Sequence, residues 1–159
     1  MATTIVPSNL VVTITESYSL NGVDYGNTMN KTYTDNGQVS QRVMSIAGKG
    51  AESVAWTDIL ALSTVDGQGQ VVKADYKYFR ITNLDTVNTL YLRVYNGTNW
   101  IALEVTPASS SLFMDAGTDI PATATTAITL RDIQAIAGQS SSADDAIDVE
   151  FVMVTGVTA

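Results

Sequence analysis

Apolar and polar residues alternate with a period of two along much of this chain. The pattern is clearest between Tyr76 and Met114, where the sequences NLDTVN, NGTN and TPASSS each follow a strand-like run. Leu90, Leu92 and Val94 fall on one face of the run before Asn96-Gly97, opposite Tyr91, Arg93 and Tyr95. Such alternation predicts antiparallel strands with one buried face. Asn96-Gly97 is typical of a tight hairpin turn, because both residues tolerate positive φ.

Similar runs lie on both sides of this segment. We expect further strands at residues 10–18, 28–34, 38–47, 112–114, 123–133 and 147–155, with turns at 21–22 and 35–37. Residues 53–62 fit one helical turn or a short strand, and residues 134–146 are expected to form a flexible polar loop. The inward face of the last strand is predicted to carry Ile147, Val149, Phe151 and Met153. Val152 and Val154 make its end apolar on both faces, so another sheet or another subunit should cover it.

The strand pattern predicts the fold class. About eight to ten short strands, with turn signals roughly every 8–12 residues, are typical of a sandwich, jelly roll or small barrel. No convincing helix and no internal repeat interrupt the pattern. We therefore predict an all-β protein, an antiparallel, jelly-roll-like β-sandwich formed by residues 1–159 as a single domain, with residues 1–9 as an extended N-terminal arm.

Composition narrows the possible functions. The chain contains neither cysteine nor histidine, which excludes disulfides, thiolate metal sites and catalytic constellations that need either residue. We expect no enzyme activity, no cofactor and no metal. The formal net charge of −8 argues against nucleic acid as a partner. No apolar run is long enough for a membrane helix and the start lacks the pattern of a signal peptide, so a soluble protein without membrane contact is expected.

Carboxylates offer two candidate sites. Asp144, Asp145, Asp148 and Glu150 are of the residue type that binds calcium, but they lack the D-x-D-x-D-G pattern, and a solvated loop leading into a strand is favoured. Glu16 and Glu104 could be proposed as a glycosidase pair. Two separate surface positions are favoured, because catalytic carboxyl groups need a defined separation across a cleft. A carboxylate-dependent hydrolase is therefore the least favoured hypothesis.

Aromatic residues gather around the central hairpin. Tyr and Trp provide large contact areas with few rotatable bonds, which suits a sugar-binding or subunit-contact surface. Cross-strand packing within the sheet is favoured for any single residue, while for Tyr91 and Tyr95 the two interpretations are balanced. The aromatic set comprises Tyr76, Tyr78, Tyr91, Tyr95 and Trp100. The residues predicted to contact a subunit or partner are Tyr91, Tyr95, Trp100, Val152 and Val154.

Two segments resemble a known class of protein. The string YFRITNLDTVN at residues 78–88, and to a lesser degree the opening VTITESYSLNGVDYGNT, are similar to small virion structural proteins of tailed bacteriophages, notably marine phages and cyanophages. The resemblance implies an all-β particle component and transfers no catalytic residue. It implies a capsid decoration (cement) protein that is made in the host cytoplasm and resides in the virion, where it binds the major capsid protein as a homo-oligomer, with a trimer favoured. The alternative is a tail- or fibre-associated module that binds host surface glycan.

Overall fold

The computed structural model describes residues 7–50, 56–63, 71–72, 76–95, 98, 100–115, 119–120, 128–129 and 133–156. This part of the chain is all-β, as predicted, and contains no helix. It therefore has no helical segment of the length and apolar character that crossing a membrane requires. Two five-stranded sheets carry the fold, and both are predominantly antiparallel.

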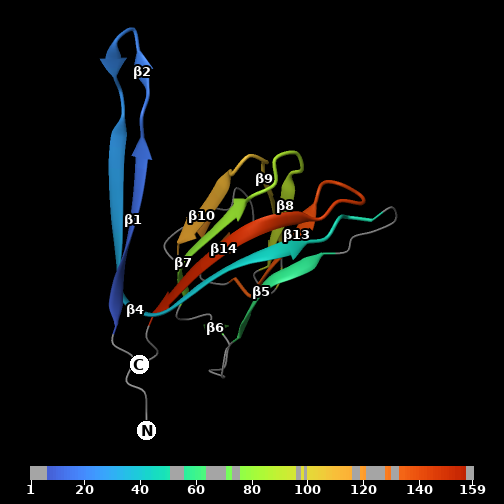
Figure 1. Cartoon of the computed structure of the whole chain (residues 1–159). Helices are drawn as coiled ribbons and strands as arrows, with labels where there is room; N and C mark the ends of the chain where they lie inside the picture. The colour runs from blue at the N-terminus through green and yellow to red at the C-terminus, as the bar shows by residue number, and fades with distance from the viewer. Residues whose placement is uncertain are drawn as a thin grey trace.

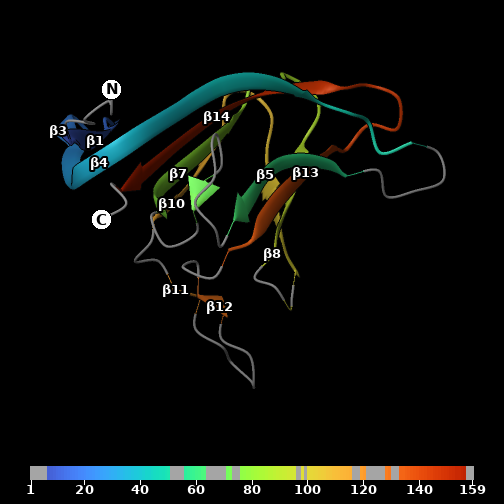
Figure 2. The same cartoon turned by 90° about the horizontal axis from the view of Figure 1, so that it is seen from below.

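The first sheet has the strand order β1-β4-β14-β7-β10 and is antiparallel throughout. It curls into a half-barrel, with β4 sweeping along its length (Figure 2). Its strands are β1 (Ser8–Glu16), β4 (Asn27–Ile46), β14 (Ile147–Gly156), β7 (Tyr76–Asn83) and β10 (Ser111–Asp115).

The second sheet has the order β6-β5-β13-β8-β9, in which only the short β5–β6 pair is parallel. Its strands are β6 (Val71–Val72), β5 (Thr57–Ser63), β13 (Ala135–Ser140), β8 (Leu90–Tyr95) and β9 (Trp100–Val105). Two small hairpin ladders complete the described strands: β2 (Ser19–Leu20) with β3 (Val23–Asp24), and β11 (Asp119–Ile120) with β12 (Ile128–Thr129).

One hydrophobic core joins the two sheets. The predicted inward faces of β8 and β14 are confirmed, because Leu90, Leu92, Val94 and Ile147, Val149, Phe151, Met153 are all buried in it. Phe79 and Phe151 meet near its centre, with ring centroids 5.2 Å apart and planes tilted by 54°. Burying a side chain of this size stabilises the fold by about 1.5–3 kcal/mol. The sheets are therefore held together mainly by apolar packing.

The inward side of β4 could not be chosen from its sequence, and the structure decides it. Ile46 is fully buried, and Met44 packs against the core. Arg42 lies on the same side: its guanidinium sits 5.4 Å from the ring centroid of Phe151 and donates to the carbonyl of Ile59 on the second sheet. Arg42 thus bridges the two sheets with its charged end at the margin of the core.

The turn predicted at residues 35–37 is wrong. β4 continues through it as a single strand of 20 residues. Asp35 has a φ of 55°, and the pairing register shifts beside it on both neighbouring strands, so the segment forms a bulge instead of a reversal. The side-chain amide of Asn36 donates to the carbonyl of Tyr33 over 2.8 Å, and Lys77 donates to the carbonyls of Thr34 and Asp35. These contacts hold the bend.

The flexible loop predicted at residues 134–146 is also wrong in its first half. Ala135–Ser140 forms β13, which pairs with β5 on one side and with β8 on the other. Its small residues do not alternate between apolar and polar, so the sequence did not predict a strand. In the structure β13 lies between two other strands and is buried on both faces. Gly138 shows why they are small, since an added Cβ would lie 2.9 Å from Ile59 Cδ1 and 3.1 Å from Leu90 Cδ1.

The remaining strand predictions have mixed outcomes. The ambiguous segment at residues 53–62 forms a strand from Thr57 onward, and β8 pairs with β9 as the expected hairpin. The Asn96-Gly97 turn itself lies outside the described residues, as does most of the predicted strand at 123–133. Of the predicted N-terminal arm, residues 1–6 lie outside the described part, while Ser8 and Asn9 open β1.

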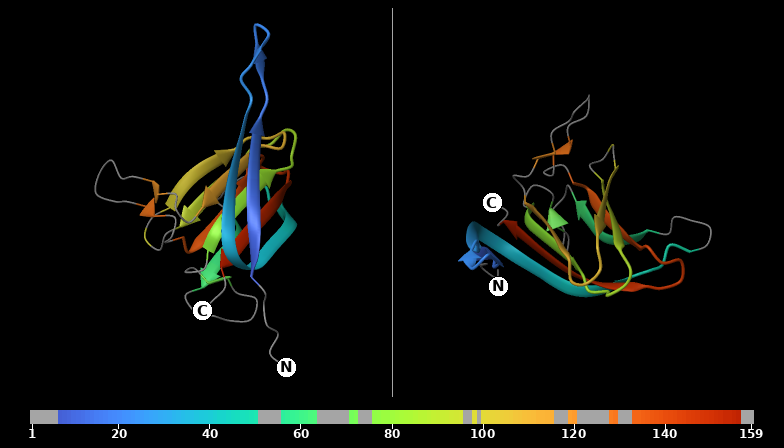
Figure 3. Two further views of the ribbon diagram at one scale, coloured as in Figure 1. Left: turned by 90° about the vertical axis from the view of Figure 1, so that its left-hand side faces the viewer. Right: turned by 90° about the horizontal axis from the view of Figure 1, so that it is seen from above.

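A long hairpin projects from the first sheet (Figures 1 and 3). It consists of β1, the β2–β3 ladder and the first half of β4, and we call it the arm (residues 8–35). β1 pairs only with the first half of β4, whereas β14 pairs with the second half. The bulge at Asp35 marks where β4 leaves the body of the protein and enters the arm.

Candidate interaction surfaces

The tip of the arm is apolar and exposed. Asn21 and Gly22, with φ values of 52° and 79°, form the two-residue turn that their sequence predicts. Tyr18 and Tyr25 stack with their ring centroids 5.5 Å apart. Leu20 and Val23 pair across the turn, with 59% and 52% of their surface exposed. A two-stranded hairpin alone is marginally stable in water, so an exposed apolar tip of this kind gains from a partner surface.

The base of the arm lies over the first sheet and encloses a groove of about 340 Å³. The Tyr33 ring of the arm approaches the Tyr78 ring of β7, with centroids 5.5 Å apart, and Lys31 lies 5.3 Å from the Tyr33 ring. Burial raises the pKa of Tyr78, and the charge of Arg80 opposes this shift. The other groove residues are Val12, Ile14, Met29, Asn30, Phe113 and Met114.

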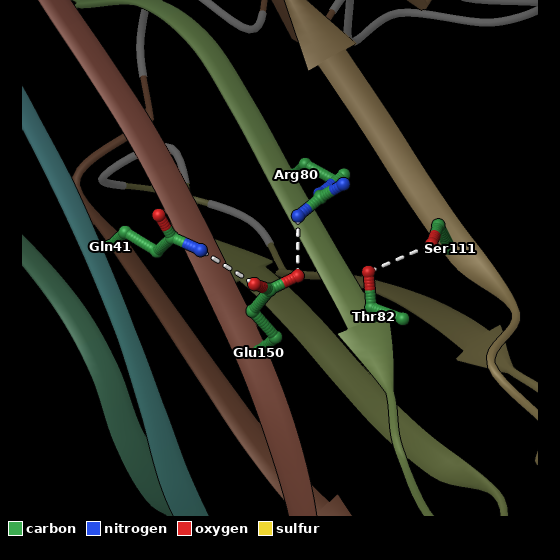
Figure 4. Close-up of polar contacts among 5 residues, drawn as sticks. All are labelled: Gln41, Arg80, Thr82, Ser111 and Glu150. Carbon is green, nitrogen blue, oxygen red and sulfur yellow. Dashed lines mark hydrogen bonds and ion pairs between the residues drawn. The ribbon is translucent and has the colours of Figure 1, made fainter. Parts of the chain in front are cut away.

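The outer face of the first sheet combines apolar and polar strips. Val39 and Val43 of β4 are more than half exposed. Beside them runs a polar strip in which Glu150 accepts from Gln41 Nε2 over 2.7 Å and forms an ion pair with Arg80 (Figure 4). Thr82 and Ser111 share a hydroxyl hydrogen bond of 2.8 Å across β7 and β10. Glu150 thus pairs with both neighbouring strands, while the Nε atom of Arg80 is buried without a hydrogen-bond partner.

The outer face of the second sheet carries an aromatic stack of a different kind. The guanidinium carbon of Arg93 lies 4.5 Å from the ring centroid of Trp56 and 4.1 Å from that of Trp100. Trp100 in turn stacks on Tyr95, with centroids 4.5 Å apart. The four residues follow one another as Trp56, Arg93, Trp100 and Tyr95, which we call the aromatic stack. Each cation–π contact contributes about 0.5–2 kcal/mol.

Residues 83–88, in the string that carries the phage resemblance, form a hydrogen-bonded turn. Asn83 is fully buried, and its amide donates to the carbonyls of Asn88 and Val105 over 2.9 and 3.0 Å. Its side-chain oxygen accepts from the N–H of Asp85. The Asp85 carboxylate accepts from the N–H groups of Asn88 and Val87, which lowers its pKa. The N-x-D part of this spacing thus has a structural cause, whereas Asn88 takes part through its backbone.

The acidic candidates are separated by the fold. Glu150 is paired with Arg80 and Gln41, while Asp145 accepts from the Ser142 hydroxyl. No group of three or more potential metal ligands occurs among the residues that the structure describes. Glu16 ends β1 on the arm, whereas Glu104 lies in β9 of the second sheet.

The five predicted contact residues fall on two different surfaces. Tyr91, Tyr95 and Trp100 lie on the outer face of the second sheet, where Tyr95 and Trp100 belong to the aromatic stack. Val152 and Val154 lie on the outer face of the first sheet, near the arm. Val154 is fully buried within its own chain, while Val152 is half-buried. Their contact role remains a prediction.

Sequence reasoning missed the arm and the partners of Trp100. The arm was hidden because β4 was assigned to two separate strands, at residues 28–34 and 38–47, with a turn between them. Arg93 and Trp100 lie on the paired strands of the predicted hairpin, but Trp56 joins them only through the pairing of β5, β13 and β8, which no local pattern encodes. The one available signal was the outward position of Arg93 between Tyr91 and Tyr95.

Comparisons with known proteins do not assign a role to these surfaces. No family model matches the chain, and neither a curated protein nor a solved structure matches it.

Proposed function

We propose that the protein is a virion structural component of a tailed bacteriophage, a decoration protein that binds the outer capsid shell as an oligomer. The observation that carries the proposal is the projecting arm with its exposed apolar tip, Tyr18, Leu20, Val23 and Tyr25. The resemblance at residues 78–88 and the lack of cysteine and histidine point the same way. A part that attaches to a shell needs an extended contact surface and no catalytic group.

The proposed fold is a jelly roll, a class that includes viral capsid domains. Strand order supports it. When β4, β5, β7, β8, β9, β10, β13 and β14 are numbered one to eight, the sheets read 1-8-3-6 and 2-7-4-5. Strands one to four alternate between the two sheets, and so do strands five to eight. Two Greek keys wrapped into a jelly roll have this strand order. β1 is then an addition to the edge of the first sheet, and it makes the arm possible.

The arm and the outer face of the first sheet form the proposed contact region. The groove between them is lined mainly by apolar side chains, and Phe113 and Met29 at its margin are 45% and 50% exposed. Closed symmetric oligomers are the commonest assemblies, and a trimer suits three-fold positions of a shell. The major capsid protein and further copies of the chain are the proposed partners.

Two measurements test this proposal. Quantitative mass spectrometry of purified particles should find the chain in many copies, and its absence from the particle would overturn the proposal. The double variant Leu20→Ser/Val23→Ser should lose particle binding in a sedimentation assay. The matched control, Leu84→Ser/Val87→Ser, removes two other exposed apolar side chains outside the arm and should bind normally. Equal binding by both variants would exclude the arm tip from the contact.

A second candidate function is favoured by the aromatic stack. Trp100 is 46% exposed on the outer face of the second sheet, away from the arm. Such a surface suits a tail- or fibre-associated module that binds host surface glycan. A glycan array that compares the wild type with Trp100→Ala tests this function. Binding that the substitution leaves unchanged would exclude the stack as the glycan site.

A further inference from the structure

Arg93 has an unusual environment for a surface arginine. The indole rings of Trp56 and Trp100 both lie against its guanidinium, with ring centroids 4.5 and 4.1 Å from the central carbon. Its Nε is buried and has no hydrogen-bond partner. Strand pairing places two carboxylates near Arg93, those of Asp58 on β5 and Glu104 on β9. Neither forms an ion pair with Arg93 in the described part of the chain. Since Nε is buried, the terminal N–H groups of the guanidinium are the donors that a ligand can reach.

This geometry selects the kind of group that can bind. A guanidinium presents five N–H donors in its own plane and matches a carboxylate through two parallel hydrogen bonds. Because two indole rings lie against the guanidinium, we expect a ligand to approach along its edge, where the N–H groups point. The rings also shield the contact from water, which strengthens a charge-assisted hydrogen bond.

The surroundings favour a carboxylate that belongs to a sugar over a bare anion. Asp58 and Glu104 are exposed acceptors on neighbouring strands, and the chain carries a net charge of −8. These charges weaken the binding of a simple anion, but their oxygens can accept hydrogen bonds from hydroxyl groups. A uronic acid offers both parts, a planar carboxylate for Arg93 and hydroxyl groups for the acidic residues around it.

We propose that Arg93, held between Trp56 and Trp100, binds the carboxylate of a uronic-acid-containing glycan on the outer face of the second sheet. The proposal rests on the glycan-binding candidate function and gives it a ligand class. It does not depend on the arm or on a position in the capsid.

The chain carries its own reporter for this site. Its sequence contains two tryptophans, and both flank Arg93. Intrinsic tryptophan fluorescence therefore reports on the aromatic stack alone. Titration of the full-length protein with trigalacturonate should change the emission in a saturable way. The fully methyl-esterified trisaccharide, which lacks the charge, should bind at least about tenfold more weakly, since charge-assisted hydrogen bonds to the carboxylate are lost.

Three variants separate the role of Arg93 from that of folding. Arg93→Gln should reduce trigalacturonate affinity at least about tenfold, and Arg93→Lys should reduce it substantially although the charge stays, because lysine lacks the planar fork. Lys31→Gln removes one positive charge beside Tyr33 on the arm and should bind like the wild type. Because Arg93→Gln removes a packed side chain, circular dichroism and a thermal melt must show that it remains folded. If it does not fold, Arg93→Lys alone decides.

Each other outcome overturns the proposal in a distinct way. Equal affinity for the acid and its methyl ester would leave glycan binding intact and exclude carboxylate recognition. Inorganic phosphate that competes as well as trigalacturonate would make the site a general anion site. No response to trigalacturonate would overturn the uronate proposal, and the glycan array would then decide separately whether the stack binds a neutral sugar. Full affinity in Arg93→Gln would exclude Arg93.

Discussion

Asn83 is the residue on which the turn at residues 83–88 depends most. Its side chain has no exposed surface and makes three hydrogen bonds to the backbone of residues 85, 88 and 105. Asn83→Leu keeps a similar size but leaves two carbonyls without a donor and one N–H without an acceptor. Leaving a buried polar group unpaired costs about 1–3 kcal/mol. The Val105 carbonyl is buried and should incur such a penalty, whereas the other two groups are only part-buried and should cost less.

We therefore expect Asn83→Leu to lower the free energy of unfolding by about 2–5 kcal/mol. For a domain of this size, each kcal/mol corresponds to roughly 2–4 °C in Tm, so Tm should fall by about 4–20 °C. Urea unfolding followed by tryptophan fluorescence measures the free energy, and a calorimetric scan measures Tm. Asn83→Asp should cost at least as much above neutral pH, because the new carboxylate would face two carbonyl oxygens and lie close to Asp85.

Asn88 provides the matched control. It is the second asparagine of the same turn, but it contributes its backbone carbonyl and N–H to the contacts around Asn83 and Asp85. Asn88→Ala should therefore change stability by no more than about 0.5 kcal/mol. The reasoning would be refuted if Asn83→Leu cost less than about 1 kcal/mol, or if Asn88→Ala cost as much as Asn83→Leu.

Three further predictions concern the fold. The N–H groups of Asn88 and Val87 lower the pKa of Asp85 in the folded state. The charged carboxylate therefore stabilises the folded protein fully above the unfolded pKa of about 4. This stabilisation is lost as the pH falls through the folded pKa. The difference in unfolding free energy between the wild type and Asp85→Asn should therefore shrink on acidification, and parallel pH curves would contradict the assignment. Gly138→Ala should lower the free energy of unfolding by about 1–3 kcal/mol, because the new Cβ contacts the flexible ends of two side chains. Gly48→Ala should lower it more, because the new Cβ would lie 2.6 Å from the backbone oxygen of Ala143. If urea unfolding gave the reverse order, the backbone around Ala143 would move more easily than this reasoning assumes. Phe151→Ala should cost about 3–5 kcal/mol in the same assay, and a loss below 1 kcal/mol would mean that the Phe79–Phe151 contact is not central to the core.

The prediction errors have a common physical origin. The DNG sequence at residues 35–37 carries strong turn residues, but β1 and β14 pair with β4 on both sides of it and keep the strand extended. Within this sequence Asp35 adopts the positive φ that its turn residues favour, and it forms a bulge in place of a turn. At β13, the small residues that suggested a loop are required by the close approach of Ile59 and Leu90. In both cases long-range pairing overrode the local signal.

Alternation of apolar residues determined the core strands β8 and β14, because period two in a half-buried strand follows from the geometry of the backbone. It predicted the inward faces of these two strands and the all-β class. The surfaces depended on the tertiary structure. The arm exists because β4 is long enough to pair with β14 in one half and with β1 in the other. The aromatic stack exists because β13 lies between β5 and β8 and brings Trp56 to Arg93. Such contacts join residues far apart in the chain, and a periodicity that acts over a few residues cannot specify them.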